Sequence, residues 1–445
     1  MKMSNQQNSY KKQRIHMVTA VLLAGTMLLT GCGEKDTSMQ SMDFSSIGSV
    51  ESFAGIQALK DDPITRGYCS STGYYRTVPN EKDGSQTIQY TDFATEQEIV
   101  LCSQLNCKHD SEACTAWLPT SQARNMVVPV GDKVVVLRGG NPNFFEILGD
   151  ASLAQVELMN PDGTDRQVIH QFSATERVPG MPRGGFARDS QNLYFTIESI
   201  EGGPRTVYAA NIETKQVTAL YEMVEEESRI VGGVGTDLVL EYTPGAANMS
   251  LSGEDLVTHV VRFNSESKTA TPLFEHCYID VGACVDGKYI LLQTDGMIRT
   301  YDLNTGEILQ QVTVQLPDSG NYISERSMGF YDGKLMVYAE VVQTVDDEEI
   351  WQMLYLGIDS ENGAVTPVEW RYQDYFGDDQ IAQIVAETDT HFLVQTGIES
   401  RVVTMPDLEG KKYDNRSDVQ KYGLISKEDF WANRGEITPI VDVKG

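Results

Sequence analysis

The feature that most constrains the fold is a repeat of short apolar strands, each preceded by a tight polar turn. Copies begin about every 50 residues, a period typical of repeat architectures. They start at 131 (GDKVVVL), 190 (SQNLYFTI), 235 (GTDLVLEY), 286 (DGKYILL), 332 (DGKLMVYAEV) and 389 (DTHFLVQT). No stretch between them has the pattern of a long amphipathic helix, so the chain is expected to be all-β.

A second repeat, a strand–turn–strand pattern, lies between successive copies of the first. Examples are ELMNPDGTDRQVI from 157 and TYDLNTGEILQQV from 300. Each unit therefore has four strands, and such units in series predict a single β-propeller. We count seven blades, the first short on its N-terminal side, with six or eight as open alternatives. Two stacked β-sandwiches are an alternative fold, but they explain the pattern less well, because sandwiches do not require repeats of such even length.

The N-terminus predicts export and lipid attachment. Residues 1–16 carry basic side chains and no acid, and the apolar stretch Met17–Leu29 is too short to span a bilayer. It ends in Leu29-Thr30-Gly31-Cys32, which resembles the bacterial lipobox. We expect a signal peptide at 1–31, a lipidated Cys32 with a flexible tether at 32–55, and the propeller at 56–445. The alternative is an ordinary signal peptide in which Cys32 occurs by chance.

The charge of the chain limits its partners. The formal net charge is −29, with 64 acidic and 35 basic residues, and the basic N-terminal residues would be removed with the signal peptide. Such a charge opposes binding to nucleic acid or to anionic lipid. We therefore expect no nucleic-acid partner, contact with the membrane through the lipid anchor alone, and a location on the extracytoplasmic face of the cell membrane.

Three cysteines and a histidine lie within LCSQLNCKHDSEAC, residues 101–114. We expect an insert at 102–123 in the connection between blades 1 and 2. Cys69, Cys102, Cys107 and Cys114 are even in number and exported, which favours two disulfides that staple the insert. A metal ion held by His109 with Cys102, Cys107 and Cys114 is the alternative, although the close Cys-x2-Cys pair of most zinc sites is missing. Reduced thiols are the third alternative, and no cofactor is predicted.

Several of these features together resemble a known family. The lipobox, the outer hairpins, the cysteine-rich insert and the closing segment YGLISKEDFW resemble a family of Gram-positive β-propeller lipoproteins of unknown function. The hairpins are also similar to those of TolB-like propellers. The resemblance implies fold and location, and it implies no catalytic residue.

The connections between strands differ in length on the two faces of such a propeller. Turns within the inner and outer hairpins are tight, whereas the other connections are long, among them VQTVDDEEIW after 341 and the segment after 396. Long connections are where binding usually resides. Arginines recur in the links between blades and define a hypothetical ligand site with neighbouring aromatics: Arg124, Arg183, Arg229, Arg326, Trp370, Arg371 and Tyr372. Such a site would suit an acidic glycan, unless each arginine only pairs with an acid and braces its blade.

No nucleophile elbow, phosphate loop or HExxH motif is present, and no catalytic residue is assigned. The favoured function is a membrane-anchored extracytoplasmic binding or scaffold protein that recognises a glycan, a peptide or a surface protein. The alternative is a propeller-fold hydrolase or lyase that acts on extracellular glycans or peptides.

Overall fold

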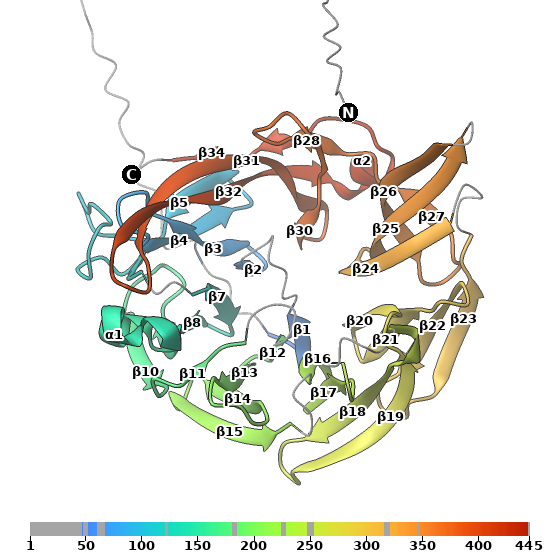
Figure 1. Ribbon diagram of the computed structural model, residues 1–445, viewed down its shortest axis with the longest axis horizontal. Coiled ribbons are helices and arrows are strands. Elements are labelled where there is room, and N and C mark those ends of the chain that lie inside the picture. The colour runs from blue at the N-terminus through green and yellow to red at the C-terminus, as the bar shows by residue number, and fades with distance from the viewer. Residues whose placement is uncertain are drawn as a thin grey trace, which may run out of the picture. The chain divides into compact units, whose positions relative to one another are not determined.

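Seven antiparallel sheets of four sequential strands follow one another along the chain, which confirms the predicted seven-bladed all-β propeller. Figure 1 shows the sheets as blades around a common centre. The computed structural model describes residues 47, 52–59, 67–120, 123–179, 185–223, 228–246, 253–315, 321–345 and 348–443. Within them, the side chains of 321–328, 341, 343–345 and 348–352 are not described. The predicted signal peptide and Cys32 lie outside the described residues.

Strands a to d of each blade run from the centre outward. Blade 1 is β2 (Gly67–Cys69), β3 (Gly73–Pro79), β4 (Gln86–Asp92) and β5 (Gln97–Val100), with the short β6 (Trp117–Leu118) also on β4. Blade 2 is β7 (Asn125–Val130), β8 (Lys133–Arg138), β9 (Gln155–Met159) and β10 (Gln167–Gln171). Blade 3 is β12 (Phe186–Arg188), β13 (Asn192–Ser199), β14 (Thr206–Asn211) and β15 (Gln216–Glu222), with β11 (Glu176–Arg177) on β13. Blade 4 is β16 (Arg229–Val234), β17 (Asp237–Tyr242), β18 (Val257–Asn264) and β19 (Thr269–Cys277).

The second half of the chain supplies the remaining blades. Blade 5 is β20 (Val281–Val285), β21 (Lys288–Leu292), β22 (Met297–Asp302) and β23 (Ile308–Thr313). Blade 6 is β24 (Asn321–Tyr331), β25 (Lys334–Val345), β26 (Glu348–Asp359) and β27 (Val365–Pro367). Blade 7 is β30 (Ile384–Glu387), β31 (His391–Pro406), β32 (Lys412–Ser426) and β33 (Thr438–Pro439). A separate hairpin, β28 (Arg371–Gln373) and β29 (Asp379–Ile381), lies in the link between blades 6 and 7.

In the described residues, helices are short and lie in connections. They are α1 (Phe145–Leu148), which is flanked by the 3-10 turns η2 (Pro142–Phe144) and η3 (Gly149–Ser152), then η4 (Gly253–Asp255) and α2 (Lys427–Trp431). In the part of the chain that the structure describes, no helix has the length and apolarity needed to cross a bilayer.

The repeated Asp-Gly pairs explain the tight turns between strands a and b. Asp286 and Gly287 have φ values of 46° and 72°, and Asp332 and Gly333 have 48° and 76°. Positive φ at both central residues is the geometry of a two-residue hairpin turn that matches the twist of the strands. The apolar strands that follow are buried between neighbouring blades, as in Val134–Leu137 of β8, where all four side chains are fully buried.

The ring closes where the last blade meets the first. The C-terminal strand β34 (Val441–Asp442) pairs in parallel with β5, outside blade 1. Arg76 of β3 lies between the first and the last blade. It donates two hydrogen bonds to Glu98 of β5, at 2.7 and 2.5 Å. It donates a third, of 2.8 Å, to the carbonyl of Gln420 in β32. The Arg76 guanidinium also lies over the Tyr422 ring. A buried arginine thus joins blade 1 to blade 7.

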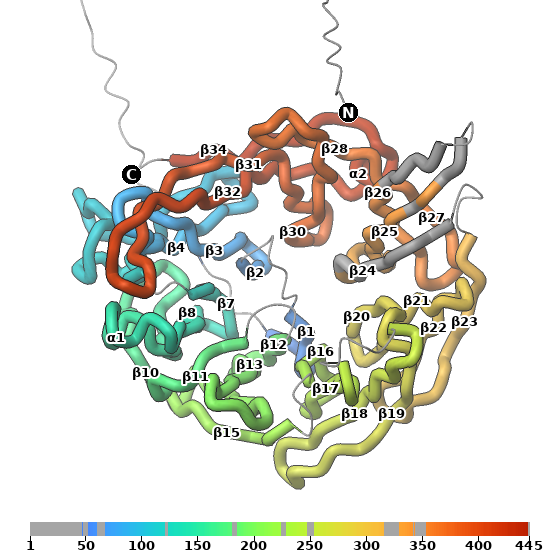
Figure 2. The backbone as a smooth tube through the Cα atoms, in the orientation of Figure 1, coloured from blue at the N-terminus to red at the C-terminus, as the bar shows by residue number. Residues whose placement is uncertain are grey.

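The N-terminal strand β1 (Gln57–Leu59) lies near the centre of the ring, where it extends blade 3 by pairing with its innermost strand, β12 (Figures 1 and 2). The backbone N–H of Ile56 donates to the carbonyl of Gly235 in blade 4, and that of Phe53 donates to the hydroxyl of Ser190 in blade 3. The chain therefore reaches the inner edge of the propeller on both sides of the predicted tether boundary at residue 55.

Candidate functional site

The cysteine-rich segment interrupts the outermost strand of blade 1. β5 and β6 both pair with β4, on either side of Ile88. The N–H of Leu101 donates to the carbonyl of Ile88 at 2.9 Å, and the N–H of Ile88 donates to the carbonyl of Ala116 at 2.8 Å. Residues 102–115 thus leave the strand and return to it at one position. The sequence-based placement of this insert in the connection between blades 1 and 2 was wrong, because its return strand β6 still belongs to blade 1.

Inside the insert, most side chains between the two end cysteines face solvent. Every residue from Ser103 to Ala113 is exposed apart from Cys107 and His109, and Leu105 is 92 % exposed. Cys102 and Cys114, at the two ends, are buried. The insert therefore has no apolar core of its own.

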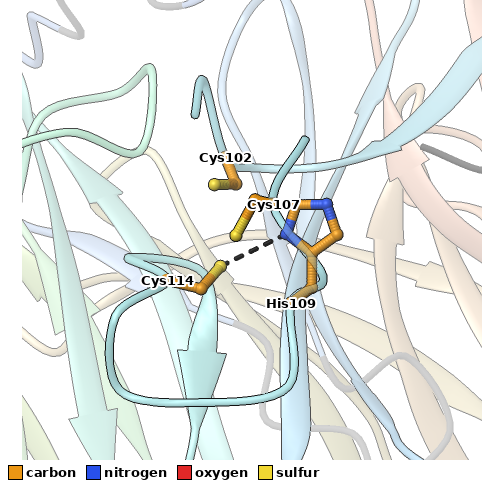
Figure 3. Close-up of side chains that lie close together, drawn as sticks. All are labelled: Cys102, Cys107, His109 and Cys114. Atoms are coloured by element: carbon orange, nitrogen blue, oxygen red, sulfur yellow. Dashed lines mark hydrogen bonds between the residues drawn. The ribbon is translucent and has the colours of Figure 1, made fainter. Parts of the chain in front are cut away.

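The four withdrawn side chains converge on one point. The sulfur atoms of Cys102, Cys107 and Cys114 and a ring nitrogen of His109 all lie within 4.8 Å of one another (Figure 3). His109 Nδ1 is 3.3 Å from Cys114 Sγ. Asn106 and His109 have left-handed backbone, with φ of 58° and 54°, which turns the chain sharply on both sides of Cys107.

Burial sets the protonation of this cluster. It raises the pKa of the Cys114 thiol to about 12, and hydrogen bonds with the neighbouring thiols act in the same direction. It also lowers the pKa of His109, which keeps the imidazole neutral at neutral pH. A neutral imidazole and three thiols are a donor set that could hold one metal ion.

The two expected disulfides are not formed, because none of the six cysteines that the structure describes is in a disulfide. Three thiols share one point in the insert, while Cys69 lies in β2, the innermost strand of the same blade. Three inter-strand spacings separate β2 from β5, roughly 14 Å in all, whereas a disulfide requires Cα atoms within about 7 Å. Cys69 therefore cannot complete a second pair with the insert.

The arginines proposed as a ligand site have different surroundings. Arg229 donates to Glu241 from Nε at 2.8 Å, with its Nη2 at 2.7 Å from the same carboxylate oxygen. Arg371 is exposed and donates to the carbonyls of Val368 and Trp370. Arg124 is half-buried directly before β7. Arg183 lies outside the described residues, and Arg326 lies in β24 with its side chain undescribed.

Two aromatic residues of the same hypothesis contact blade 7. The Trp370 indole donates to the carbonyl of Phe430 at 3.0 Å and packs with the apolar cluster of blades 6 and 7. Tyr372 is half-buried, and burial raises the pKa of its hydroxyl to about 12. The structure thus gives Trp370 a packing role and does not gather these residues with Arg229 into one described pocket.

Arginine–carboxylate pairs recur in the first four blades; sequence reasoning offered pairing with an acid as the alternative for Arg229 and missed the other three pairs. The pairs are Arg76–Glu98, Arg166–Glu157, Arg205–Glu198 and Arg229–Glu241. The carboxylates could have been found as single acids inside apolar strands, as in QVELM and DLVLEY. Glu241 also lines a pocket of about 110 Å³, but Arg229 and the Tyr289 hydroxyl occupy its two oxygens.

The segment after 396 is paired β-structure, where the sequence predicted a loop. β31 and β32 stay in register from Gly397↔Lys421 to Pro406↔Lys412, and we call residues 397–421 the arm. The arm reaches blade 1, where the N–H of Thr404 donates to the carbonyl of Glu81. In the same way, the predicted loop after 341 forms the extended hairpin of β25 and β26.

Comparisons with known proteins find several solved structures to which the chain is similar. The chain is similar to the β-propeller domain of the trilobed protease from Pyrococcus furiosus, with 11 % identity over 84 % of this chain and 98 % of that chain and a TM-score of 0.42. It is similar to TolB from Acinetobacter baumannii (12 % identity, 78 % of each chain, TM-score 0.30). It is also similar to an oligogalacturonate lyase in complex with manganese (12 % identity, 66 % of this chain and 76 % of that chain, TM-score 0.37). No family model matches, and no curated protein matches.

Proposed function

We propose that the protein is a lipid-anchored extracytoplasmic binding protein whose ligand contacts the face formed by the b–c and inter-blade connections. The observation that carries the proposal is the difference between the two faces. One face has two-residue turns such as Asp286-Gly287. The other carries the arm, the long β25–β26 hairpin, the helical turns at 142–152 and the β28–β29 hairpin. Elaborated connections on a rigid scaffold are typical of recognition surfaces.

The arm and the β28–β29 hairpin supply side chains suited to binding. The guanidinium of Arg416 lies 3.5 Å from the centre of the Tyr375 ring and 5.0 Å from that of Phe376. Phe376 is 69 % exposed, and Leu408 at the tip of the arm is 64 % exposed. Aromatic residues and arginine dominate binding energy in protein interfaces. Arg371 and Arg416, like Lys411 and Lys412 near the tip of the arm, are exposed cations that could meet an acidic group on a glycan or a peptide.

The pairing of carboxylates favours binding over hydrolysis or elimination. A catalytic acid or base needs an oxygen that can reach the substrate. Glu98, Glu157, Glu198 and Glu241 are instead bonded to arginines inside their blades. We therefore assign these paired acids a structural role within their blades.

The test is a screen of glycans and peptides on a soluble form that begins at residue 33, with product formation monitored in parallel. We expect a ligand that binds without turnover and that is weakened at least about tenfold by Phe376→Ala, the loss of one binding hot spot. Leu309→Ala, at an exposed apolar residue of the outer strand of blade 5, is the matched control and should bind normally. Turnover of a ligand, or equal binding by both variants, would contradict the proposal.

Membrane attachment has its own test. Cys32→Ser removes the thiol that would receive the lipid, so the protein should leave the membrane fraction. Partitioning that stays unchanged in this variant would exclude the lipid anchor.

A further inference from the structure

We propose that Cys102, Cys107, His109 and Cys114 bind one zinc ion, which orders the insert of blade 1. The site goes beyond the proposed function, because it depends neither on the lipid anchor nor on the ligand of the other face. It lies on the outer edge of blade 1, where β5 and β6 both pair with β4.

The donor geometry is close to that of a tetrahedral site. Bond lengths of about 2.3 Å to sulfur and 2.0–2.1 Å to nitrogen place tetrahedral ligands roughly 3.5–3.8 Å apart. The four donor atoms already lie within 4.8 Å of one another, and His109 Nδ1 and Cys114 Sγ are 3.3 Å apart. Shifts of about 1 Å or less would therefore complete the site. The Nδ1 atom faces the sulfur atoms in Figure 3, while the other ring nitrogen points away.

The propeller itself fixes two of the four ligands. Cys102 and Cys114 lie next to Leu101 and close to Ala116, whose backbones are hydrogen-bonded to Ile88. From blade 2, Arg166 donates to the carbonyls of Thr115 and Trp117, both at 2.7 Å. Cys107 and His109 come from the exposed turn between them. The ion would thus link the exposed turn to Cys102 and Cys114, which the hydrogen-bonded strands of the blade already hold in place.

The energetic reason for a metal is the missing core. Ordering the backbone costs conformational entropy, and residues 103–113 recover almost none of this free energy by apolar burial, since nine of the eleven are exposed. Metal binding supplies folding free energy directly, as it does in small zinc domains that are unfolded without the metal. Cys107 and His109 are the only withdrawn side chains of residues 103–113, and together with the buried Cys102 and Cys114 they suit this role.

The donor types select zinc over other common ions. Calcium and magnesium take oxygen ligands, whereas three thiolates and one imidazole form a closed tetrahedral set of the Cys3His type. Zinc has no redox chemistry of its own, and coordination would protect the three thiols from pairing in an exported protein. This explains how free cysteines and an oxidising location are compatible.

The test measures metal in the purified protein that begins at residue 33, produced with zinc in the medium. We expect about one zinc per chain, the stoichiometry of a closed four-ligand site. Cobalt should replace it and give the visible absorption of a tetrahedral thiolate complex. Cys107→Ser and His109→Ala should each lose most of the metal, whereas Cys277→Ser, a cysteine in blade 4, should keep it.

A second measurement covers variants that fail to fold. In the unmodified protein, a chelator should make the three cluster thiols reactive toward an alkylating reagent, and added zinc should protect them again. The proposal would be overturned by less than about a tenth of an equivalent of zinc, or by mass spectrometry that maps a disulfide among Cys102, Cys107 and Cys114. Ligand binding by the proposed recognition surface should survive zinc removal. This separates failure of the zinc site from failure of the proposed function.

Discussion

The insert of blade 1 and the arm of blade 7 are both additions to a regular propeller, but they are ordered in different ways. The arm continues its parent strands, so its backbone groups pair along the ladder from Gly397↔Lys421 to Pro406↔Lys412. The insert leaves its strand at Leu101 and returns at Ala116 without a ladder of its own. Four of its side chains instead meet at one point.

The difference shows that extra chain can be stabilised without extending the core. A hairpin satisfies its own backbone hydrogen bonds and tolerates exposed side chains along its length. A short irregular segment has no such ladder of backbone hydrogen bonds, so cross-links between its side chains have to stabilise it instead. We expect the arm to resist changes of single side chains, and the insert to depend on each of its four ligands.

The largest effect is expected at Arg76, which connects the two regions. It bonds to Glu98 in the strand that leads into the insert and to the carbonyl of Gln420 at the base of the arm. Arg76→Met would leave Glu98 buried without a counter-charge, so we expect a loss of about 3–5 kcal/mol in the free energy of unfolding, measured in denaturant.

The double variant Arg76→Met, Glu98→Gln is the control for that change. It removes the buried charge together with its partner and should recover most of the loss. A single variant as stable as the unmodified protein would show that this bridge does not hold the ring closed.

A smaller, pH-dependent effect is expected at the junction of blades 4 and 5, far from both additions. Burial alone would lower the pKa of His276, but Glu241, the carbonyl of Cys277 and Asp280 outweigh it, and the pKa is raised. The folded state therefore binds this proton more tightly than the unfolded state. The contribution to stability is complete below the unfolded pKa, about 6.5, and is lost as pH rises through the folded pKa.

His276→Gln should consequently reduce stability more at pH 5 than at pH 9, measured by thermal unfolding at both values. In this variant, the stability of the insert and of the arm should depend on pH as it does in the unmodified protein. Equal losses at the two pH values would contradict the assigned protonation.

The smallest effect is expected at Arg416, where the arm contacts the β28–β29 hairpin. Arg416→Ala removes the stacking on Tyr375 and Phe376, which is worth about 0.5–1 kcal/mol at an exposed site. Because the backbone ladder remains, the arm should stay paired, with only the tip of the β28–β29 hairpin more open to hydrogen exchange. Loss of protection along the whole arm would show that its side chains, and not its ladder, hold it.

Much of the fold could be predicted from the sequence, because apolar strands and Asp-Gly turns are local signals that recur along the chain. The additions to the propeller and the candidate site were harder to predict. Pairing of the arm could not be predicted, since its polar, exposed residues have no alternation that marks a strand. The spacing of Cys102, Cys107, His109 and Cys114 left disulfides and metal open, because the choice depends on where Cys69 lies across the sheet. The arginine–carboxylate pairs join residues such as Arg76 and Glu98 that only blade geometry brings together.

The most direct test of the difference between insert and arm is amide hydrogen exchange with and without a chelator. Zinc removal should abolish protection in residues 102–115, including the amides of Cys107 and Cys114, which donate to Gln104 and Ser111. Protection of the arm, residues 397–421, should be unchanged, because its ladder needs no metal. An insert that stays equally protected without metal, or an arm that loses protection with it, would contradict the account.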